Sequence, residues 1–364
     1  MENLGITPFN NIYQGKSILL TGNTGFKGSW LALWLQRLGA EVSGLSLEPI
    51  SNPSHWSLLD LDMVDRRIDI RNLSDIKEFL HIVEPEIVFH LAAQPLVRRS
   101  YLNPLETWST NVMGTANLLE ACREQSSVNS IIIITTDKCY ENQERSKGYK
   151  ETDRLGGHDP YSASKASTEL LVSSYRKAFF NTPDSPLIAT VRAGNVIGGG
   201  DWSEDRLIPD MMRAVNENKS LEIRSPNATR PWQHVLESLS GYLLLGQKLL
   251  QGKKNFAQAW NFGPNDDGNR TVEEVLLCLK DEWPKLNWEV SQSKQPYEAS
   301  LLHLDSSKAH ELLEWEPVWS IEEGIKETAA WYKALFEQNI VVSTTQLDEY
   351  IKKAQSAGLK WSHS

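Results

Sequence analysis

Short apolar runs alternate with longer segments of helical spacing over the first half of the chain. Ser17–Thr21 is an apolar run typical of a buried strand. The segment SWLALWLQRLG, which follows it in the sequence, has apolar residues at helical spacing and ends at Gly39. Such alternation predicts a parallel sheet covered by helices on both faces. The same criteria predict strands at Glu41–Leu47, Met63–Ile70, Ile87–Leu91, Ile131–Thr135 and Leu187–Arg192, and helices at Ile76–Ile82, Thr107–Arg123 and Ser164–Phe180.

The pattern changes after Arg192, where glycine, proline and tryptophan become more frequent and the alternation lapses. We therefore expect an α/β protein with a Rossmann-type, doubly wound parallel sheet over residues 1–192. A smaller mixed α/β domain is expected mainly over residues 193–364, where it would close over a ligand. Later segments such as 235–262, in particular Gln258–Phe262, are expected to return to the large sheet.

Composition narrows the class of protein. The chain of 364 residues has 40% hydrophobic residues, enough for a large core, and a net charge of -10, which argues against non-specific binding to nucleic acid. Its three cysteines are too scattered for a disulfide framework or a metal site. The N-terminus lacks a signal-peptide pattern, and no apolar run approaches the roughly 18 residues of a membrane span. We expect a cytoplasmic protein that binds neither nucleic acid, membrane nor metal.

The first motif is the glycine-rich TGNTGFKG, in which Gly22, Gly25 and Gly28 are three residues apart. It lies between a predicted strand and a predicted helix, where backbone N–H groups and the helix N-terminus favour a pyrophosphate. The spacing differs from the usual G-x-G-x-x-G fingerprint, so a generic glycine turn is the alternative.

Acidic and small residues near the predicted strand ends extend this interpretation. Glu48, about twenty residues beyond the glycine turn, can bind ribose hydroxyls and would repel a 2′-phosphate, which favours NAD over NADP. Asp69 could accept from an adenine amino group, although a capping role for a neighbour is the alternative. Ala92 and Ala93 leave room for a cofactor, or equally for close helix packing.

A second motif, YSASK, places Tyr161 and Lys165 four residues apart and so on one helical face. A tyrosine becomes a usable base when an adjacent ammonium stabilises its phenolate, and the same lysine can hold a ribose. Upstream, ITTDKCY sets Asp137 beside Lys138 at a strand end. These two form either a solvated turn or an acid and a base at the mouth of a pocket.

Together these residues resemble the extended short-chain dehydrogenase/reductase family and, within it, the nucleotide-sugar 4,6-dehydratases. The resemblance rests on TGNTGFKGSWL, EIVFHLAAQPLVRRSY, STNVMGT, TTDKCY, DPYSASK, VRAGNVIGGGDW, RLIPD and RPWQHV, and it runs from about Gly15 to Trp331. It implies a tightly held NAD, a nucleotide-sugar substrate, a role in deoxysugar or O-antigen-type lipopolysaccharide biosynthesis, and a homodimer, which could pair again as a dimer of dimers.

The resemblance also implies a division of labour in catalysis. Tyr161 would take the proton of the sugar's 4-hydroxyl during oxidation, and Thr136 would hydrogen-bond the resulting ketone. Asp137 matches the acid that protonates the departing 6-hydroxyl.

Lys138 stands where most relatives that act on dTDP- or GDP-sugars carry glutamate. A lysine acts as a base only when uncharged, which burial and Lys165 would favour and Asp137 would oppose. Lys138 could instead stabilise an enolate while another group, such as Glu141, takes the carbon-5 proton. The branch of the family that acts on CDP-glucose resembles this chain in carrying lysine here, so the resemblance favours CDP-glucose as the substrate.

The resemblance assigns binding residues as well. An arginine can grip a diphosphate bidentately, and Arg230 in RPWQHV matches the family's pyrophosphate contact best. Cofactor contacts are expected from Gly22, Thr24, Gly25, Phe26, Lys27, Gly28, Glu48, Asp69, Ile70, Leu91, Ala92, Ala93, Gln94, Asn111, Tyr161 and Lys165, and substrate contacts from Gln94, Arg192, Asn195, Arg206, Leu207, Arg230 and His234.

Three alternatives remain open at this point. A dehydratase could act on a dTDP-, GDP- or UDP-linked sugar. A nucleotide-sugar 4-epimerase needs Tyr161 and Lys165 but no acid–base pair for elimination, so Asp137 beside Lys138 disfavours it. A non-catalytic NAD-binding protein would have little need for the tyrosine and lysine together.

Overall fold

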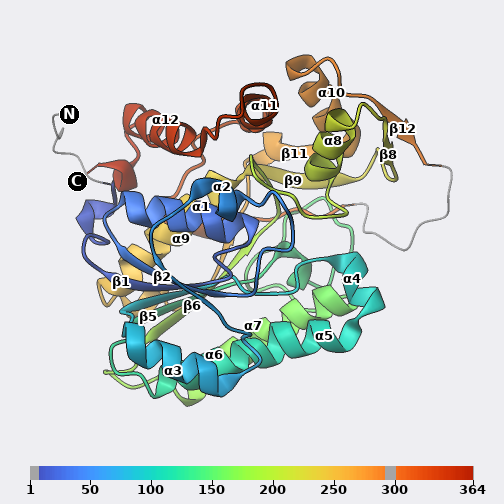
Figure 1. The fold of residues 1–364 in the computed structure, drawn as a ribbon. Helices are drawn as coiled ribbons and strands as arrows, with labels where there is room; N and C mark the ends of the chain where they lie inside the picture. The colour runs from blue at the N-terminus through green and yellow to red at the C-terminus, as the bar shows by residue number, and fades with distance from the viewer. Residues whose placement is uncertain (1–7, 292–300, 364) are drawn as a thin grey trace, which may run out of the picture.

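A computed structural model of the protein describes residues 8–291 and 301–363 (Figure 1). A seven-stranded parallel sheet forms its centre, with the strand order β10-β6-β5-β4-β1-β2-β3. This sheet confirms the doubly wound α/β fold that the alternating pattern predicted. The strands are β1 Ser17–Thr21, β2 Glu41–Ser46, β3 Val64–Arg67, β4 Ile87–His90, β5 Ser130–Ile134, β6 Leu187–Ala193 and β10 Ala259–Phe262.

The order of the strands reverses at β1, which lies between β2 and β4. In doubly wound sheets a ligand crevice opens at such a reversal, beyond the carboxyl ends of the strands. Thr21 is level with His90, and His90 is level with Ile133, so β1, β4 and β5 end at one edge. The segments that follow these three strands therefore meet in space.

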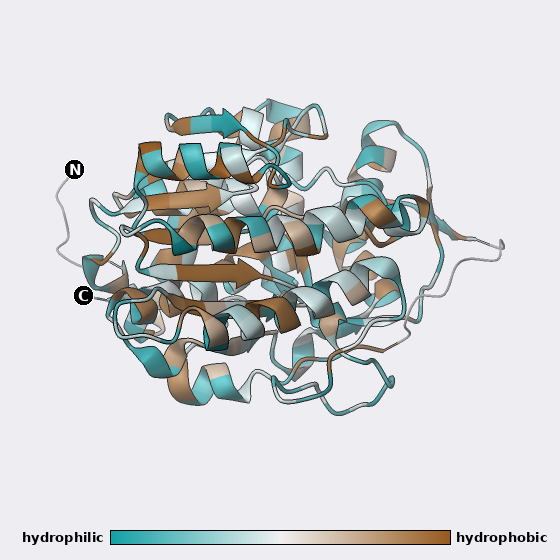
Figure 2. Cartoon of the chain, turned by 90° about the horizontal axis from the view of Figure 1, so that it is seen from below, coloured by the Kyte–Doolittle hydropathy of each residue, from teal (hydrophilic) through white to brown (hydrophobic). Residues whose placement is uncertain are grey.

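Helices cover both faces of the sheet (Figure 1). One layer, with α1 and α9, forms a core that includes Trp30 and Leu243, and the other layer forms a core that includes Phe79 and Val172. Figure 2 shows the central strands as predominantly hydrophobic, with more hydrophilic helices in front of them. The helices of the layers are α1 Phe26–Arg37 and α9 Val235–Leu250, opposite α3 Leu73–Val83, α6 Gly114–Arg123 and α7 Pro160–Ala178.

The helix expected over Thr107–Arg123 is interrupted. It consists of α5 (Pro104–Trp108), a π-helical turn at Ser109–Met113, and α6. Periodicity alone could not reveal this turn, because its apolar residues keep helical spacing. The turn carries Asn111, whose side chain binds the backbone of Gln94 and the hydroxyl of Ser164. Such turns often mark functional sites.

Helix α7 begins four residues earlier than its apolar pattern indicated. The Asp159 side chain accepts from the Ser162 N–H, and Pro160 occupies the first helical position. Both are standard helix-start features. The early start places Tyr161 in the first turn of the helix.

The smaller domain is built from short strands and helices after β6. One sheet has the order β11-β9-β7, and a second pairs β12 with β8. Strand β10 and helix α9 lie with the large sheet, against β5 and β6. The strands outside the large sheet are β7 Asn195–Ile197, β8 Leu221–Ile223, β9 Thr229–His234, β11 Asn269–Thr271 and β12 Trp288–Val290. The α-helices after β6 other than α9 are α8 Leu207–Asn216, α10 Val272–Glu282, α11 Ile321–Gln338 and α12 Ser343–Ser356. Two short helices, α2 His55–Leu59 and α4 Val97–Leu102, come before β6.

Among the helices in the described part of the chain, none has the length and apolar composition required to cross a bilayer. The three cysteines, Cys122, Cys139 and Cys278, are free thiols.

Arg192 is buried in a polar network under the sheet edge, with both its own and the Glu169 side chain only 3% exposed. Its guanidinium donates to both carboxylate oxygens of Glu169 over 2.9 and 2.8 Å, and to the Tyr140 hydroxyl over 2.7 Å. Burial would raise the pKa of Glu169, but Arg192 and two threonine hydroxyls outweigh it and lower that pKa. Arg192 is thus engaged in the protein interior and does not line the cavity at the carboxyl edge of the sheet, so its expected contact with substrate stays a prediction that this position does not favour.

We predict that Glu169→Gln lowers the free energy of unfolding by about 3 kcal/mol, because it leaves the Arg192 charge buried without its carboxylate. Since the folded-state pKa of Glu169 is lowered, its stabilisation is present above the unfolded-state pKa and is lost on acidification. Urea titration at neutral pH measures the change. The control is Glu124→Gln, which breaks the exposed pair with Lys77 and should cost less than about 1 kcal/mol. Equal losses in the two variants would contradict the prediction.

Candidate active site

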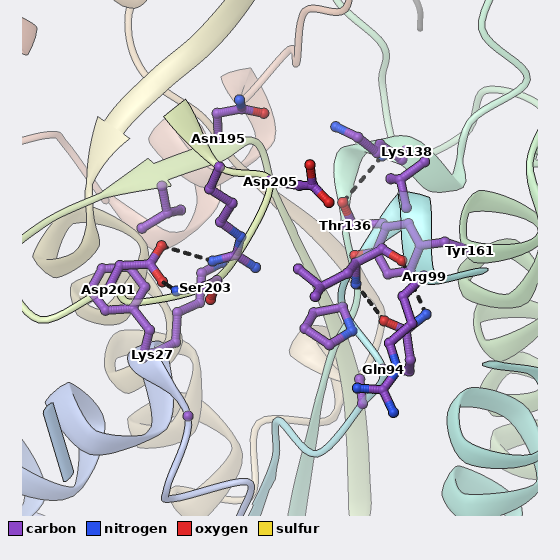
Figure 3. Close-up of a pocket in the computed structure, with 18 of the residues that line it drawn as sticks. Lys27, Gln94, Arg99, Thr136, Lys138, Tyr161, Asn195, Asp201, Ser203 and Asp205 are labelled. Atoms are coloured by element: carbon purple, nitrogen blue, oxygen red, sulfur yellow. Dashed lines mark hydrogen bonds and ion pairs between the residues drawn. The ribbon is translucent and has the colours of Figure 1, made fainter. Parts of the chain in front are cut away.

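A cavity of about 1200 Å³ opens at the carboxyl edge of the large sheet and extends between the two domains. This exceeds the roughly 300–1,000 Å³ of a typical small-molecule pocket, so it has room for more than one ligand. Its walls come from the segments after β1, β2, β3, β4 and β5, the start of α7, and the loop before α8. Figure 3 shows residues from both sides of the cavity.

The glycine turn forms one end of this cavity. Gly22 has a φ of +73°, and a Cβ there would lie 2.7 Å from the Ala92 nitrogen, while a Cβ on Gly28 would lie 2.0 Å from the Gly22 oxygen. Side chains are therefore excluded, and α1 begins directly after Gly25 without a side-chain cap. The free N–H groups of this helix start suit a phosphate.

Two carboxylates lie beside the glycine turn, as the sequence predicted. Glu48 lines the cavity beyond β2 and pairs with Arg67 at 3.1 Å. Asp69 lines it beyond β3, and hydrogen bonds from Arg71 lower its pKa against the opposing effect of partial burial. The other expected cofactor contacts that line the same region are Thr24, Gly25, Phe26, Lys27, Gly28, Ile70, Leu91, Ala92, Ala93 and Gln94.

These residues fit a dinucleotide. The close approach at Gly22 and Gly28 leaves the backbone open to a pyrophosphate, and Glu48 offers acceptors for ribose hydroxyls.

The burial of Asp137 and Lys138 decides between the two interpretations of this pair. Asp137 is almost wholly buried; one carboxylate oxygen accepts from the Thr136 hydroxyl at 2.9 Å, and the other has no hydrogen-bond partner among the described residues. A buried acceptor without a partner is uncommon in proteins. Lys138 is half-buried and lines the cavity, and no described residue pairs with its ammonium. The pair is not a solvated turn.

Tyr161 lies in the cavity opposite the smaller domain (Figure 3). Burial raises the pKa of Tyr161 to about 12, although a hydrogen bond with Thr136 and the charge of Arg206 oppose the rise. Lys165 lines the cavity one turn later and donates to the Ile134 carbonyl at 3.1 Å. Burial lowers the pKa of Lys165 to about 8. Tyr161 is therefore a neutral phenol in the ligand-free cavity.

Lys27 extends from the glycine turn into the cavity. Its ammonium is buried near the Tyr242 ring, 5.9 Å from the ring centroid. Burial lowers the pKa of Lys27 to about 7, with a further contribution from Arg206. The side chain reaches from the glycine turn toward the catalytic side chains.

The smaller domain contributes cationic groups to the cavity. Arg206 pairs with the buried carboxylate of Asp201 at 3.0 Å, and Arg230 lines the wall with its guanidinium near the Thr229 carbonyl. Asn195 and Leu207 also line this wall.

Two further expected contacts do not reach the cavity. His234 is buried against Trp30 and Trp319, and it caps α9 by accepting from the Leu236 N–H. Asn111 is buried below the cavity floor, where it holds the Gln94 backbone. Neither side chain lines the cavity in the ligand-free protein, so direct contact of either with a ligand stays a prediction.

The sequence reasoning missed Arg98, Arg99, Asp201 and Asp205, which all line the cavity. The only sequence sign was the adjacent arginines of the RRSY segment. In the described part of the chain, no group of three or more His, Cys, Asp and Glu side chains is arranged to hold a metal ion.

The chain is similar in sequence to known nucleotide-sugar dehydratases. The family model described as GDP-mannose 4,6 dehydratase matches residues 19–328. The chain is 44% identical over 350 residues to a CDP-glucose 4,6-dehydratase of Salmonella typhimurium, covering 94% of this chain and 98% of that protein. It is 26% identical over 339 residues to a dTDP-D-glucose 4,6-dehydratase of Mus musculus, covering 88% and 90%.

Among solved structures, a UDP-glucuronic acid 4-epimerase from Bacillus cereus, in complex with UDP-glucuronic acid and NAD, superimposes with a TM-score of 0.74 at 27% identity, covering 87% of this chain and 99% of that one. The chain belongs to the nucleotide-sugar 4,6-dehydratase family of extended short-chain dehydrogenases/reductases.

Proposed function

We propose that this protein is an NAD-dependent hydro-lyase that converts CDP-glucose to CDP-4-keto-6-deoxyglucose and water. The observation that carries the proposal is the convergence of Tyr161, Thr136, Asp137 and Lys138 on one cavity. The 44% identity to a CDP-glucose 4,6-dehydratase supports this substrate over other nucleotide sugars.

NAD, when bound, supplies the acceptor and later donor of the hydride that moves from carbon 4 to carbon 6, and a positive charge near the phenol. Gly22, Gly25 and Gly28 would hold its pyrophosphate, and Glu48 its adenosine ribose. Lys165 is one turn from Tyr161 and would hold the second ribose.

In the oxidation step Tyr161 takes the proton of the 4-hydroxyl. Its pKa of about 12 in the ligand-free cavity means that the phenol must be made more acidic by positive charge. The charge of Arg206 already acts in this direction. Thr136, which hydrogen-bonds Tyr161, is placed to donate to the oxygen that becomes the ketone.

In the elimination step Asp137 donates a proton to the leaving 6-hydroxyl. Its unpartnered carboxylate oxygen is free to meet a substrate hydroxyl. Lys138, in the next position, takes the carbon-5 proton or stabilises the enolate that forms when it leaves. Glu141 is a weaker alternative, because its carboxylate pairs with Arg154 at 3.2 Å.

We propose further that the protein forms a homodimer through the layer of α4, α5 and α7. Large apolar side chains are exposed there, among them Leu102 (80% exposed), Leu105 (83%), Met113 and Leu170. An exposed apolar stretch of this kind marks an interaction surface. The free thiols of all three cysteines suit the cytoplasm, where activated sugars are made into deoxysugars such as those of O-antigens.

The test of substrate is direct. The purified protein with NAD is incubated with CDP-, dTDP-, GDP- and UDP-glucose and GDP-mannose, and the ultraviolet absorbance that 4-keto-6-deoxy sugars develop in alkali is measured. We expect the highest kcat/KM with CDP-glucose. Product of equal mass to the substrate, with no ketone, would identify an epimerase instead.

Tyr161→Phe should reduce turnover of CDP-glucose by about 10³-fold, because the variant lacks the group that accepts the 4-hydroxyl proton. No absorbance of reduced nicotinamide should appear when substrate is added. Tyr175→Phe is the matched control on the same helix, since Tyr175 lies outside the cavity. Normal turnover by Tyr161→Phe would remove the tyrosine from the mechanism.

Lys138→Glu should slow dehydration about 10²-fold while oxidation continues, because a carboxylate cannot replace the positive charge of Lys138 in stabilising the enolate. Reduced nicotinamide should then accumulate with CDP-glucose in single-turnover absorbance measurements. Lys147→Glu, an exposed lysine outside the cavity, is the charge-matched control. Full dehydration by Lys138→Glu would show that a carboxylate serves equally well at this position.

A further inference from the structure

Asp205 connects the two domains across the cavity. It lies in the loop between β7 and α8, and its carboxylate oxygen Oδ1 accepts from Arg98 at 3.1 Å and from Arg224 at 3.4 Å. Arg98 belongs to α4, beyond β4 of the large sheet, whereas Arg224 follows β8 of the smaller domain. All three side chains line the cavity.

Figure 3 shows the Asp205 carboxylate projecting between two walls. Asn195 and Asp201 stand on one side, and Thr136, Lys138 and Tyr161 on the other. The side chains of Asp205 and Arg98 are each more than one-third exposed, so the contact is open to the solvent in the cavity and to a ligand. It is not a buried structural pair like that of Arg192 and Glu169.

The backbone at Asp205 is also unusual. Its φ of +57° lies in the left-handed region, which costs most residues about 1 kcal/mol but suits Asp and Asn. This conformation directs the carboxylate toward the two arginines, whereas the next residue, Arg206, turns back to Asp201. The loop thus presents one anion and one cation to the same cavity.

The charges of Arg98, Arg224 and Asp205 favour a strongly anionic ligand at this position. The guanidinium groups of Arg98 and Arg224 share one carboxylate oxygen of Asp205, so they are close enough to repel each other when that carboxylate moves away. A diphosphate carries more negative charge than a carboxylate and accepts bidentate hydrogen bonds from arginine. It can therefore replace the Asp205 carboxylate between Arg98 and Arg224, while a neutral ligand gains nothing by doing so.

We propose that Asp205 is an internal counter-anion of the substrate pocket, which occupies Arg98 and Arg224 until the diphosphate of the substrate displaces it. The proposal rests on the proposed function in taking a nucleoside diphosphate sugar as the displacing ligand. Asp205 thereby sets the affinity of the pocket and its discrimination between diphosphates and less charged ligands.

The test measures the binding of inorganic pyrophosphate to the full-length protein by isothermal titration calorimetry. Saturating NAD is present, so that the glycine turn is occupied. Asp205→Asn removes the charge but keeps the shape and tolerates the left-handed backbone. Because an exposed ion pair contributes about 0.2–1 kcal/mol, loss of the two competing pairs should tighten pyrophosphate binding about twofold to thirtyfold.

The matched control is Glu204→Gln, which makes the same change of charge one residue earlier. Glu204 is exposed, does not line the cavity, and forms no ion pair with another described residue. The affinity of the Glu204→Gln variant for pyrophosphate should equal that of the parent protein. The gain of Asp205→Asn should also shrink as sodium chloride is raised, since salt screens exposed charges.

Three results would overturn the proposal. Unchanged or weaker binding by Asp205→Asn would mean that the carboxylate does not compete with the ligand, and an equal gain in Glu204→Gln would mean that only net charge matters. Failure of every variant to bind pyrophosphate would deny the anion subsite. None of these measurements involves turnover, so they are independent of the product analysis that tests the dehydratase function.

Discussion

The parallel register of β1, β4 and β5 is the constraint on which the site depends. Because Thr21, His90 and Ile133 are level, the glycine turn, Ala92 and Thr136 come together beyond the strand ends. Side-chain hydrogen bonds connect the ends of these strands. Thr21 and His90 are joined by a hydrogen bond of 2.7 Å, and His90 and Thr115 by one of 2.9 Å. Burial lowers the pKa of His90 to about 3, so the imidazole stays neutral and adds no charge beneath the cavity. A shift of one residue in any of these strands would turn its side chains to the other face.

The electrostatics of the cavity differ from those of the whole molecule. The chain has a net charge of -10, yet Lys27, Lys138, Lys165, Arg206 and Arg230 face one cavity. Net negative charge repels anions over long distances, whereas these cations act within the few ångströms of a bound ligand. Asp201 and Asp205 keep part of this charge neutralised in the ligand-free protein. Affinity for an anionic ligand is thus set by local pairs and not by the overall charge.

The buried groups fall into two kinds with different roles. Arg192, Glu169 and Asn111 are fully engaged with protein partners, so they fix the positions of strands and loops. Asp137 retains a buried acceptor without a partner, and Lys27 and Lys165 have pKa values lowered to about 7 and about 8. An unmet hydrogen bond or a destabilised charge costs stability, and enzymes accept this cost where chemistry requires it. These three groups of the second kind line the cavity to which we assign the reaction.

The sequence by itself determined the fold class, the glycine turn, the Tyr161–Lys165 pair and the family, because these depend on spacing within short segments. The sequence also indicated that the adjacent Asp137 and Lys138 lie at the end of a strand. Only the tertiary structure decided which charged residues face the cavity. Arg192 and Arg230 both lie on strands that end near the cavity, but Arg192 is held by the buried carboxylate of Glu169 and does not line the cavity, whereas Arg230 lines it. Likewise, Asp205, Arg98 and Arg224 are far apart in the chain and become neighbours only when two domains close around one cavity. Sequence periodicity records which face of an element is apolar, whereas the partner of a charge depends on contacts between distant segments.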